Sequence, residues 1–315
     1  MAEIPVISGR AVLDAIGPAT AVERTRHAFE RHALGEWAMP AKVYLESPPN
    51  GDFRAMPARG GGLALVKWVT SFPGNSGKGL PVVRGVVVLS DADTGEELAV
   101  IECSSVTSLR TGGAAAVSAQ VLARDGASTV GIVGCGVNGA WAARCLAAAG
   151  YGPGVCADAR PQAAEDLAGE LGWAAGSTRQ ALDQDVVVTV TPGDSHVITA
   201  DDLRPGQHIA ALGADAHGKE EVELAALASC RLFCDEWAQA SAGGELAHAV
   251  EAGAIGPDDV TQIGEVLTGS ADGRGSDDEV TLFDSTGLAI QDLAICQAVF
   301  EAWREGRIDA TLASL

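Results

Sequence analysis

The stretch that decides the fold is residues 129–150, TVGIVGCGVNGAWAARCLAAAG. An apolar run typical of a buried strand leads into three closely spaced glycines, and an alanine-rich helical pattern follows. In this context Gly134 makes a tight turn, Gly136 lets a pyrophosphate approach the backbone, and Gly139 allows the helix to pack closely. The helix start also offers free backbone N–H groups to phosphate oxygens, those of Val137, Asn138 and Gly139. The stretch therefore predicts a dinucleotide-binding loop.

A carboxylate at the end of the next predicted strand bears on the choice of dinucleotide. Asp158 stands 19 residues after Gly139, where a carboxylate hydrogen-bonds the ribose hydroxyls of NAD. Arg160 could instead neutralise the 2′-phosphate of NADP. We expect NAD and leave NADP open. The alternative for the motif is a glycine turn without a ligand, because a chain with 39 glycines produces this spacing by chance. Cys135 is expected to be only a small residue that fits the loop.

The pattern around the glycine loop predicts two domains. Strands and helices alternate over residues 113–289, which predicts a parallel, doubly wound Rossmann sheet. Ahead of it, short β-branched runs with DADTG as a hairpin turn predict a mostly antiparallel sheet. Helical spacing covers residues 11–34, and a terminal helix is expected at about 287–305. The expected fold is α/β, with an α+β domain formed by residues 1–112 and 290–315.

Composition excludes several function classes. The chain has 315 residues, of which 42 are acidic and 21 basic, so its net charge of -21 repels nucleic acids and anionic lipid surfaces. Seven cysteines show no metal-ligand spacing, and we expect reduced thiols and no metal site. The N-terminus does not read as a signal peptide, and no apolar run approaches the length of a membrane span. We therefore expect a cytoplasmic protein that binds neither nucleic acid nor membrane.

Three side chains have chemistry that suits a substrate site. Lys67 lies among apolar and aromatic neighbours in LALVKWVTS, where burial could lower the pKa of its ammonium. Arg110 carries a planar fork that suits a carboxylate. Asp215 follows the strand HIAAL, at the carboxyl end of a parallel strand where such folds place ligands. The alternatives are a solvated edge-strand lysine, a structural salt bridge and a turn or N-cap aspartate, while nearby His217 is expected to be exposed.

Five separated segments together resemble the ornithine cyclodeaminase/mu-crystallin family, which includes archaeal-type alanine dehydrogenases and cyclic ketimine reductases. They run in family order from about residue 37 to the C-terminus: KWVTSFPGN, DADTGEELAVIECSSVTSLRTGGAAAVSA, GIVGCGVNG, ALGADAHGKEEVE and IGEVLTG…TLFDSTGLAIQDLA. The resemblance implies a nicotinamide cofactor that moves hydride at the α-carbon of an amino or imino acid. It also implies a homodimer whose first domain carries the substrate site and the subunit interface, with the active site facing the dinucleotide domain.

The resemblance also implies roles for individual residues. Lys67 would contact the substrate near the reacting carbon, and Asp215 would be the general acid/base. In TLFDSTG, Ser285 and Gly287 would lie beside the nicotinamide, although Ser285 or Thr286 would also suit a helix N-cap. The cofactor residues expected in full are Arg110, Thr111, Gly134, Gly136, Val137, Asn138, Gly139, Asp158, Arg160, Thr191, Gly213, Ser285 and Gly287.

Two residues of the first domain discriminate among activities within the family. Ornithine cyclodeaminases commonly have an arginine where Lys42 stands in PAKVYL, and this lysine together with GDFRAMPA is similar to the alanine dehydrogenase side. Lys42 and Arg54 could both hold a substrate carboxylate, with exposed surface positions as the alternative for either. We therefore expect an NAD(P)-dependent oxidoreductase that acts on a small L-amino acid or imino acid. Ornithine or lysine cyclodeamination, opine-like reductive condensation and nicotinamide binding without turnover remain the alternatives.

Overall fold

The chain divides into two compact units, residues 1–110 with 288–315 and residues 111–287. The structure is a computed structural model that describes residues 3–192 and 194–314. Each unit is built around its own sheet, and the predicted α/β class is confirmed. Among the described residues, no helix combines the length and the apolar character that crossing a membrane requires.

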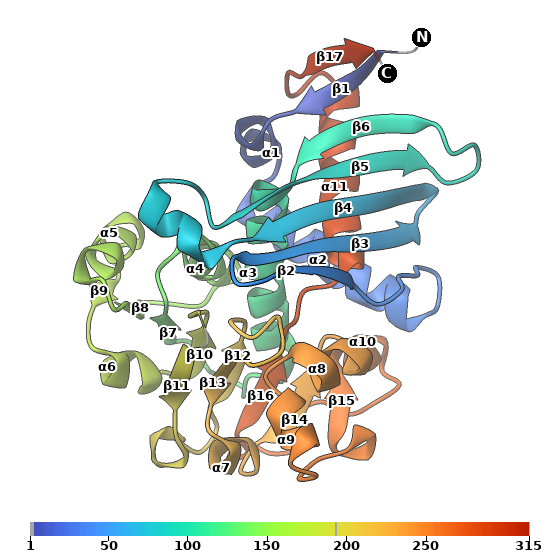
Figure 1. The fold of residues 1–315 in the computed structure, drawn as a ribbon. Helices are drawn as coiled ribbons and strands as arrows, with labels where there is room; N and C mark the ends of the chain where they lie inside the picture. The colour runs from blue at the N-terminus through green and yellow to red at the C-terminus, as the bar shows by residue number, and fades with distance from the viewer. Residues whose placement is uncertain (1–2, 193, 315) are drawn as a thin grey trace. The chain divides into compact units, whose positions relative to one another are not determined.

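The first unit is a seven-stranded sheet in the order β17-β1-β6-β5-β4-β3-β2. Neighbouring strands run antiparallel except for the parallel pair β1 and β6. Figure 1 shows these strands as a layer with α11 behind them. The strands are β1 (Glu3–Ile7), β2 (Val43–Ser47), β3 (Gly51–Gly60), β4 (Leu63–Ser71), β5 (Val83–Asp91), β6 (Glu97–Glu102) and β17 (Thr311–Ser314).

One face of this sheet is covered by helices of the same unit. The terminal helix α11 packs against α2 and against the strands β3 and β4. Buried and exposed residues alternate along β4, so Leu65, Lys67 and Val69 face the helices, whereas Val66 and Trp68 stand on the opposite face. The helices are α1 (Gly9–Ala15), α2 (Pro18–Ala33), the first part of α3 (Cys103–Leu122) and α11 (Ala289–Arg304), and η1 (Pro73–Lys78) is a short 3-10 turn.

Two details of the first unit differ from the sequence expectation. The helical pattern of residues 11–34 forms two helices, because Gly17 has extended backbone angles and Pro18 begins a new helix at its N1 position. The alternation of helices and strands was expected from residue 113, but the helix α3 already begins at Cys103. The short strand β17 was not predicted; it pairs with β1 at the edge of the sheet, a long-range pairing that local sequence does not signal.

The second unit is an eight-stranded sheet in the order β15-β14-β16-β12-β10-β7-β8-β9, with every neighbouring pair parallel. The order reverses between β7 and β10, which makes their carboxyl ends the topological switch point of the sheet. The strands are β7 (Val130–Val133), β8 (Gly154–Ala157), β9 (Ala174–Ala175), β10 (Val186–Thr189), β12 (His208–Ala211), β14 (Arg231–Cys234), β15 (Val260–Gln262) and β16 (Thr281–Asp284).

Helices pack against this sheet, and the segments that follow β10 and β12 pair with each other in a second, smaller sheet. A parallel two-stranded sheet joins β11 (Asp194–Ile198) to β13 (Glu220–Val222). The strands β7, β10, β12 and β16 are buried throughout, as expected for a parallel sheet. The helices are α4 (Val137–Ala148), α5 (Pro161–Leu171), α6 (Thr178–Leu182), α7 (Leu224–Leu227), α8 (Trp237–Gly243), α9 (Ala247–Glu251) and α10 (Ile263–Thr268), with η2 (Ala200–Asp202) and η3 (Pro257–Asp259) as 3-10 turns.

Candidate active site

The glycine loop lies between β7 and α4, at the switch point of the parallel sheet. Gly134 has a φ of +101°, a region that favours glycine. A Cβ on Gly139 would lie 1.8 Å from the carbonyl oxygen of Gly134, so this glycine is required by close packing. A Cβ on Gly136 would meet open space, and the φ of Gly136 is ordinary. The fold itself explains two of the three glycines, whereas Gly136 leaves the backbone open to a ligand.

Asp158 directly follows β8 and is hydrogen-bonded to this loop. Its Oδ2 accepts the backbone N–H of Cys135 at 2.7 Å, and its Oδ1 accepts the N–H of Arg160 at 2.8 Å. The side chain of Arg160 is 75% exposed, and its Nε lies 3.5 Å from Asp158 Oδ1. The thiol of Cys135 is buried and donates to the carbonyl of Ala157, consistent with the expected small packing residue. The carboxylate therefore fixes the glycine loop and keeps a negative charge beside it.

The loops after β10 and β12 share one carboxylate that sequence reasoning missed. Glu221 of β13 is fully buried, and its Oε1 accepts the backbone N–H of Thr191 at 2.6 Å. Its Oε2 accepts the N–H of Gly213 and the hydroxyl of Thr189, each at 2.8 Å. A Cβ on Gly213 would lie 2.4 Å from the Glu221 carboxyl carbon, which explains the glycine. Nothing in the charged run KEEVE singles Glu221 out, because only the tertiary contacts distinguish it from its acidic neighbours.

The loop after β16 is held in a similar way by Asp235, which follows β14. Asp235 Oδ2 accepts the backbone N–H of Gly287 at 2.8 Å, and the hydroxyls of Ser285 and Thr286 donate to the same carboxylate. The interpretation of Ser285 or Thr286 as a helix N-cap is wrong. The helix α11 begins at Ala289 with Leu288 as its N-cap, and both hydroxyls turn to the buried aspartate instead.

Asp215 lies in the segment between β12 and β13. Its Oδ1 lies 2.6 Å from Nζ of Lys219, four residues further along the chain. Both side chains are about one-third exposed, so the carboxylate is reachable and paired with a cation. His217 is 76% exposed, as expected, and lies 3.4 Å from Glu251. The pairing partner Lys219 was not predicted.

Lys67 in the first unit is buried and paired, not solvated at a strand edge. It is 1% exposed, and its Nζ lies 2.9 Å from Oδ1 and 2.8 Å from Oδ2 of Asp292 on α11. The hydroxyl of Thr107 on α3 accepts a further hydrogen bond at 3.2 Å. Sequence reasoning missed Asp292, although an aspartate inside the apolar helical pattern LAIQDLAICQAVF is a signal that could have indicated it.

Arg110 belongs to the same cluster. Its Nε lies 3.6 Å from Asp292 Oδ1, is buried, and has no hydrogen-bond acceptor among the described residues. Burial raises the pKa of the Cys103 thiol to about 11 and raises that of Cys296, so neither adds a negative charge at neutral pH. Lys67, Arg110 and Asp292 together carry two positive charges and one negative charge. The cluster therefore suits an additional anion. Thr111, which begins the second unit, has a buried hydroxyl without a hydrogen-bond partner in the described chain.

Arg54 on β3 faces the same side of the sheet as Lys67. It is 7% exposed, so the exposed-surface alternative does not apply to it. Its Nε donates to Oδ1 of Asp52 at 2.6 Å, and its guanidinium lies over the ring of Tyr44, 5.3 Å from the centroid. Lys42 is half-buried. The structure thus brings Lys67 and Arg110 together on one carboxylate and gives Arg54 a separate one.

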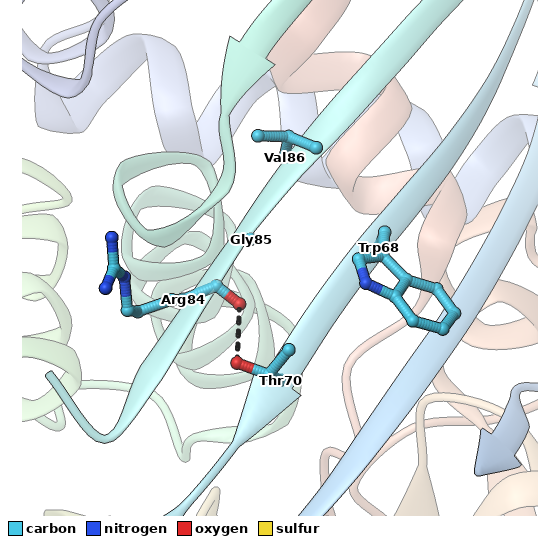
Figure 2. Close-up of a pocket in the computed structure, with 5 residues that line it drawn as sticks. All are labelled: Trp68, Thr70, Arg84, Gly85 and Val86. Carbon is cyan, nitrogen blue, oxygen red and sulfur yellow. Dashed lines mark hydrogen bonds between the residues drawn. The ribbon is translucent and has the colours of Figure 1, made fainter. Parts of the chain in front are cut away.

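A hollow of about 400 Å³ lies on the opposite face of this sheet. Figure 2 shows it between β4 and β5, where Trp68 and Val86 project and the hydroxyl of Thr70 donates to the carbonyl of Arg84. Its lining is mostly apolar, and none of the five residues that line it carries a carboxylate or a lysine ammonium. This hollow therefore does not belong to the Lys67 cluster.

Comparison with known proteins places these features in context. The family model described as ornithine cyclodeaminase/mu-crystallin family matches residues 10–307. Alanine dehydrogenase of Archaeoglobus fulgidus is 42% identical over 288 residues, 89% of each chain. Iminosuccinate reductase of Paracoccus denitrificans is 38% identical over 243 residues, 73% of this chain and 74% of the relative. A solved archaeal structure, described as an alanine dehydrogenase dimer with bound NAD, superposes with a TM-score of 0.95 at 39% identity and covers 100% of both chains.

Proposed function

This chain belongs to the ornithine cyclodeaminase/mu-crystallin family, and we propose that it is an NAD-dependent oxidoreductase acting at the α-carbon of a small L-amino acid or the matching imino acid. The observation that carries the proposal is the buried cluster of Lys67, Arg110 and Asp292, whose single excess positive charge calls for an anion. An amino or imino acid supplies that anion as its carboxylate. The relatives named as alanine dehydrogenase and iminosuccinate reductase act on compounds of this class.

The second unit fits a dinucleotide. Gly136 keeps the loop open where a pyrophosphate would approach, and the N–H groups of Val137, Asn138 and Gly139 open α4. The carboxylate of Asp158 lies beside the loop, where it would accept ribose hydroxyls and repel a 2′-phosphate. Arg160 already lies close to Asp158, which favours NAD over NADP. When bound, the nicotinamide would supply or accept the hydride.

The chain's own groups would bind the substrate and move its proton. Arg110, whose Nε has no hydrogen-bond acceptor among the described residues, would hold the carboxylate through its guanidinium group, and Arg54 or Lys42 would assist. The ammonium of Lys67, fixed by Asp292, would lie near the amine or carbonyl of the substrate and favour negative charge there. Asp215 would exchange a proton with the substrate nitrogen or with water. Lys219 donates a hydrogen bond to Asp215 and orients that side chain.

We also propose that the protein is a homodimer joined through the outer face of the first unit's sheet. Large apolar side chains there are 39 to 62% exposed, an unusual density for a sheet face in water. They come from β2, β4 and β5 and comprise Val43, Leu45, Val66, Trp68 and Val86. The archaeal relative is described as a dimer. A cytoplasmic location is consistent with seven free cysteines.

The proposal is tested by following NADH and NADPH absorbance with purified protein. The substrates are pyruvate with ammonia, oxaloacetate with ammonia, pyrroline-2-carboxylate, piperideine-2-carboxylate and keto acid–amine pairs. Samples with ornithine or lysine are assayed for proline or pipecolate. We expect NADH consumption with an imino or keto acid, and Asp215→Asn should lower kcat by about 10²–10⁴-fold while NADH binding persists. Proline or pipecolate formed without net cofactor change would replace the proposal with cyclodeamination, and NADH binding without any turnover would leave a binding protein.

A further inference from the structure

The loops at the carboxyl edge of the parallel sheet have one structural feature in common. In each of the four loops expected to contact the cofactor, a backbone N–H is accepted by a carboxylate. The pairs are Cys135 with Asp158, Thr191 with Glu221, Gly213 with Glu221, and Gly287 with Asp235. Strand ends leave such N–H groups without a ladder partner, so an acceptor here determines where the loop lies.

Glu221 differs from the other two carboxylates because it holds two loops at once. These loops follow β10 and β12, which are neighbours in the sheet. The loop after β10 carries Thr191, and the one after β12 leads through Gly213 to Asp215. A shift of Glu221 would therefore move a predicted cofactor contact and the predicted acid/base residue together.

Glu221 is itself held in place by a second buried acid. Glu245 accepts the backbone N–H of Glu221 at 2.9 Å and that of Val222 at 2.7 Å. Both side chains are fully buried. Burial raises the pKa of Glu221, and the donors from Thr191, Thr189 and Gly213 act against that shift. Three donors converging on one carboxyl group match an acceptor with no proton of its own.

We infer that Glu221 is a positioning residue that presets the loops after β10 and β12 for the dinucleotide, with Glu245 fixing the strand from which Glu221 reaches them. The inference rests on the proposed function, because the loops are significant only if the second unit binds NAD. Glu221 would touch neither substrate nor cofactor, and it would act through Thr191 and Gly213. Ordering these loops before binding lowers the entropy cost of association.

The substitution Glu221→Gln separates positioning from mere packing. The amide oxygen can replace Oε2 and keep the bonds from Gly213 and Thr189, which leaves the amide N–H₂ group facing the N–H of Thr191. Two donors then oppose each other, and the Thr191 loop is released. We expect the NADH dissociation constant to rise about tenfold, which corresponds to the loss of one buried hydrogen bond to a charged group. Hydrogen exchange should quicken in the peptide that holds Thr191 more than in the one that holds Gly213.

The matched control is Asp185→Asn, at the amino edge of the same sheet. Asp185 also accepts backbone N–H groups, those of Ser128 and Thr129, both at 3.1 Å. The substitution Asp185→Asn should lower the unfolding temperature and leave the NADH dissociation constant within about twofold of the wild-type value. If Glu221→Gln is too unstable to purify, Thr189→Val removes one donor to Glu221 without opposing donors, and NADH should bind about threefold more weakly.

NADH binding is read from its fluorescence, without turnover. Wild-type affinity in Glu221→Gln, or an equal loss of affinity in Asp185→Asn, would overturn the inference while the proposed function stands. If the wild-type chain itself binds no NADH, the proposed function fails, and the role of Glu221 fails with it. A rise in the dissociation constant confined to Glu221→Gln and Thr189→Val, with faster exchange at Thr191, supports the assignment.

Discussion

The two units bury charge in opposite ways. In the first unit, the ammonium of Lys67 faces the carboxylate of Asp292, and the two charges neutralise each other. In the second unit, Glu221, Glu245, Asp235 and Asp284 are all buried, and the hydrogen bonds recorded for their carboxyl oxygens are donated by backbone N–H groups and hydroxyls. Removing one partner of a buried ion pair leaves an unpaired charge and destabilises the fold. Neighbouring buried acids can instead lower their mutual repulsion by binding protons.

The buried acids make the stability of the second unit depend on pH. Burial, together with the charges of Asp235 and Glu245, raises the pKa of Asp284 well above its usual value. Burial, Glu221 and Glu220 raise the pKa of Glu245 to about 8. The second unit therefore carries protons near neutral pH that its unfolded chain would have lost.

The largest effect is expected from removing the partner of the buried cation. Asp292→Asn leaves the ammonium of Lys67 in a site that is 1% exposed with no countercharge. Such a change costs about 3–5 kcal/mol, because an uncompensated charge stays buried. The free energy of unfolding, from guanidinium titration at one protein concentration, measures it.

A double variant tests the cause of that loss. Lys67→Met with Asp292→Leu removes both charges and fills the space with apolar atoms, so we expect most of the lost stability to return. If the free energy of unfolding of Asp292→Asn lies within about 1 kcal/mol of the wild-type value, Asp292 is not what neutralises Lys67. The two units would then not differ in how they bury charge.

An intermediate effect is expected from Glu245→Gln, and its sign is set by the raised pKa. The folded chain binds the Glu245 proton up to about pH 8, whereas the unfolded chain releases it near 4.5. The stability from protonated Glu245 is therefore complete below pH 4.5 and is lost as pH rises towards 8, at up to about 1.4 kcal/mol per pH unit. Glutamine cannot ionise, so this decline should flatten.

Urea titrations at half-unit intervals from pH 5 to pH 8.5 measure that slope. The acids that face Glu245 are Glu221, Glu220 and Asp284, and they stay in place in the variant. If the free energy of unfolding changes equally with pH in wild type and variant, Glu245 does not bind the proton in the folded chain. The proton is then bound by another of these buried acids, or no proton is bound.

The smallest effect is expected at a surface pair. Arg144 and Glu170 form two hydrogen bonds of 2.7 and 2.8 Å, but their side chains are 29% and 48% exposed. The hydrogen bond from Arg144 lowers the pKa of Glu170, so its contribution is present above pH 4.5 and is lost as pH falls, opposite in sign to Glu245. Glu170→Gln should cost less than about 1 kcal/mol in thermal or chemical unfolding. A loss equal to that of Asp292→Asn would mean that burial does not decide the strength of these pairs.

Local sequence predicted some of the site because certain residues are constrained by their immediate neighbours. The strand, glycine loop and helix around Gly134 are predicted by periodicity and spacing. The position of Asp158 beside the loop is predicted by its distance in sequence from Gly139, at the end of the next strand. Asp292 was within reach, because a charge in an apolar helical pattern needs a partner. Glu221 and Asp235 were not, because their acceptor roles depend on N–H groups 8 to 52 residues away.

Composition and residue spacing are enough to predict an α/β protein with a dinucleotide-type loop, an excess of acidic residues and a lysine in an apolar strand. Hydrophobic periodicity and glycine positions reflect constraints within one turn or one strand, so they can be recognised in the sequence. Packing between distant elements decides which buried groups pair: Lys67 with Asp292, and Glu221 with backbone donors of two loops. Those pairings depend on the distances and burial that appear only when elements from different parts of each unit pack together.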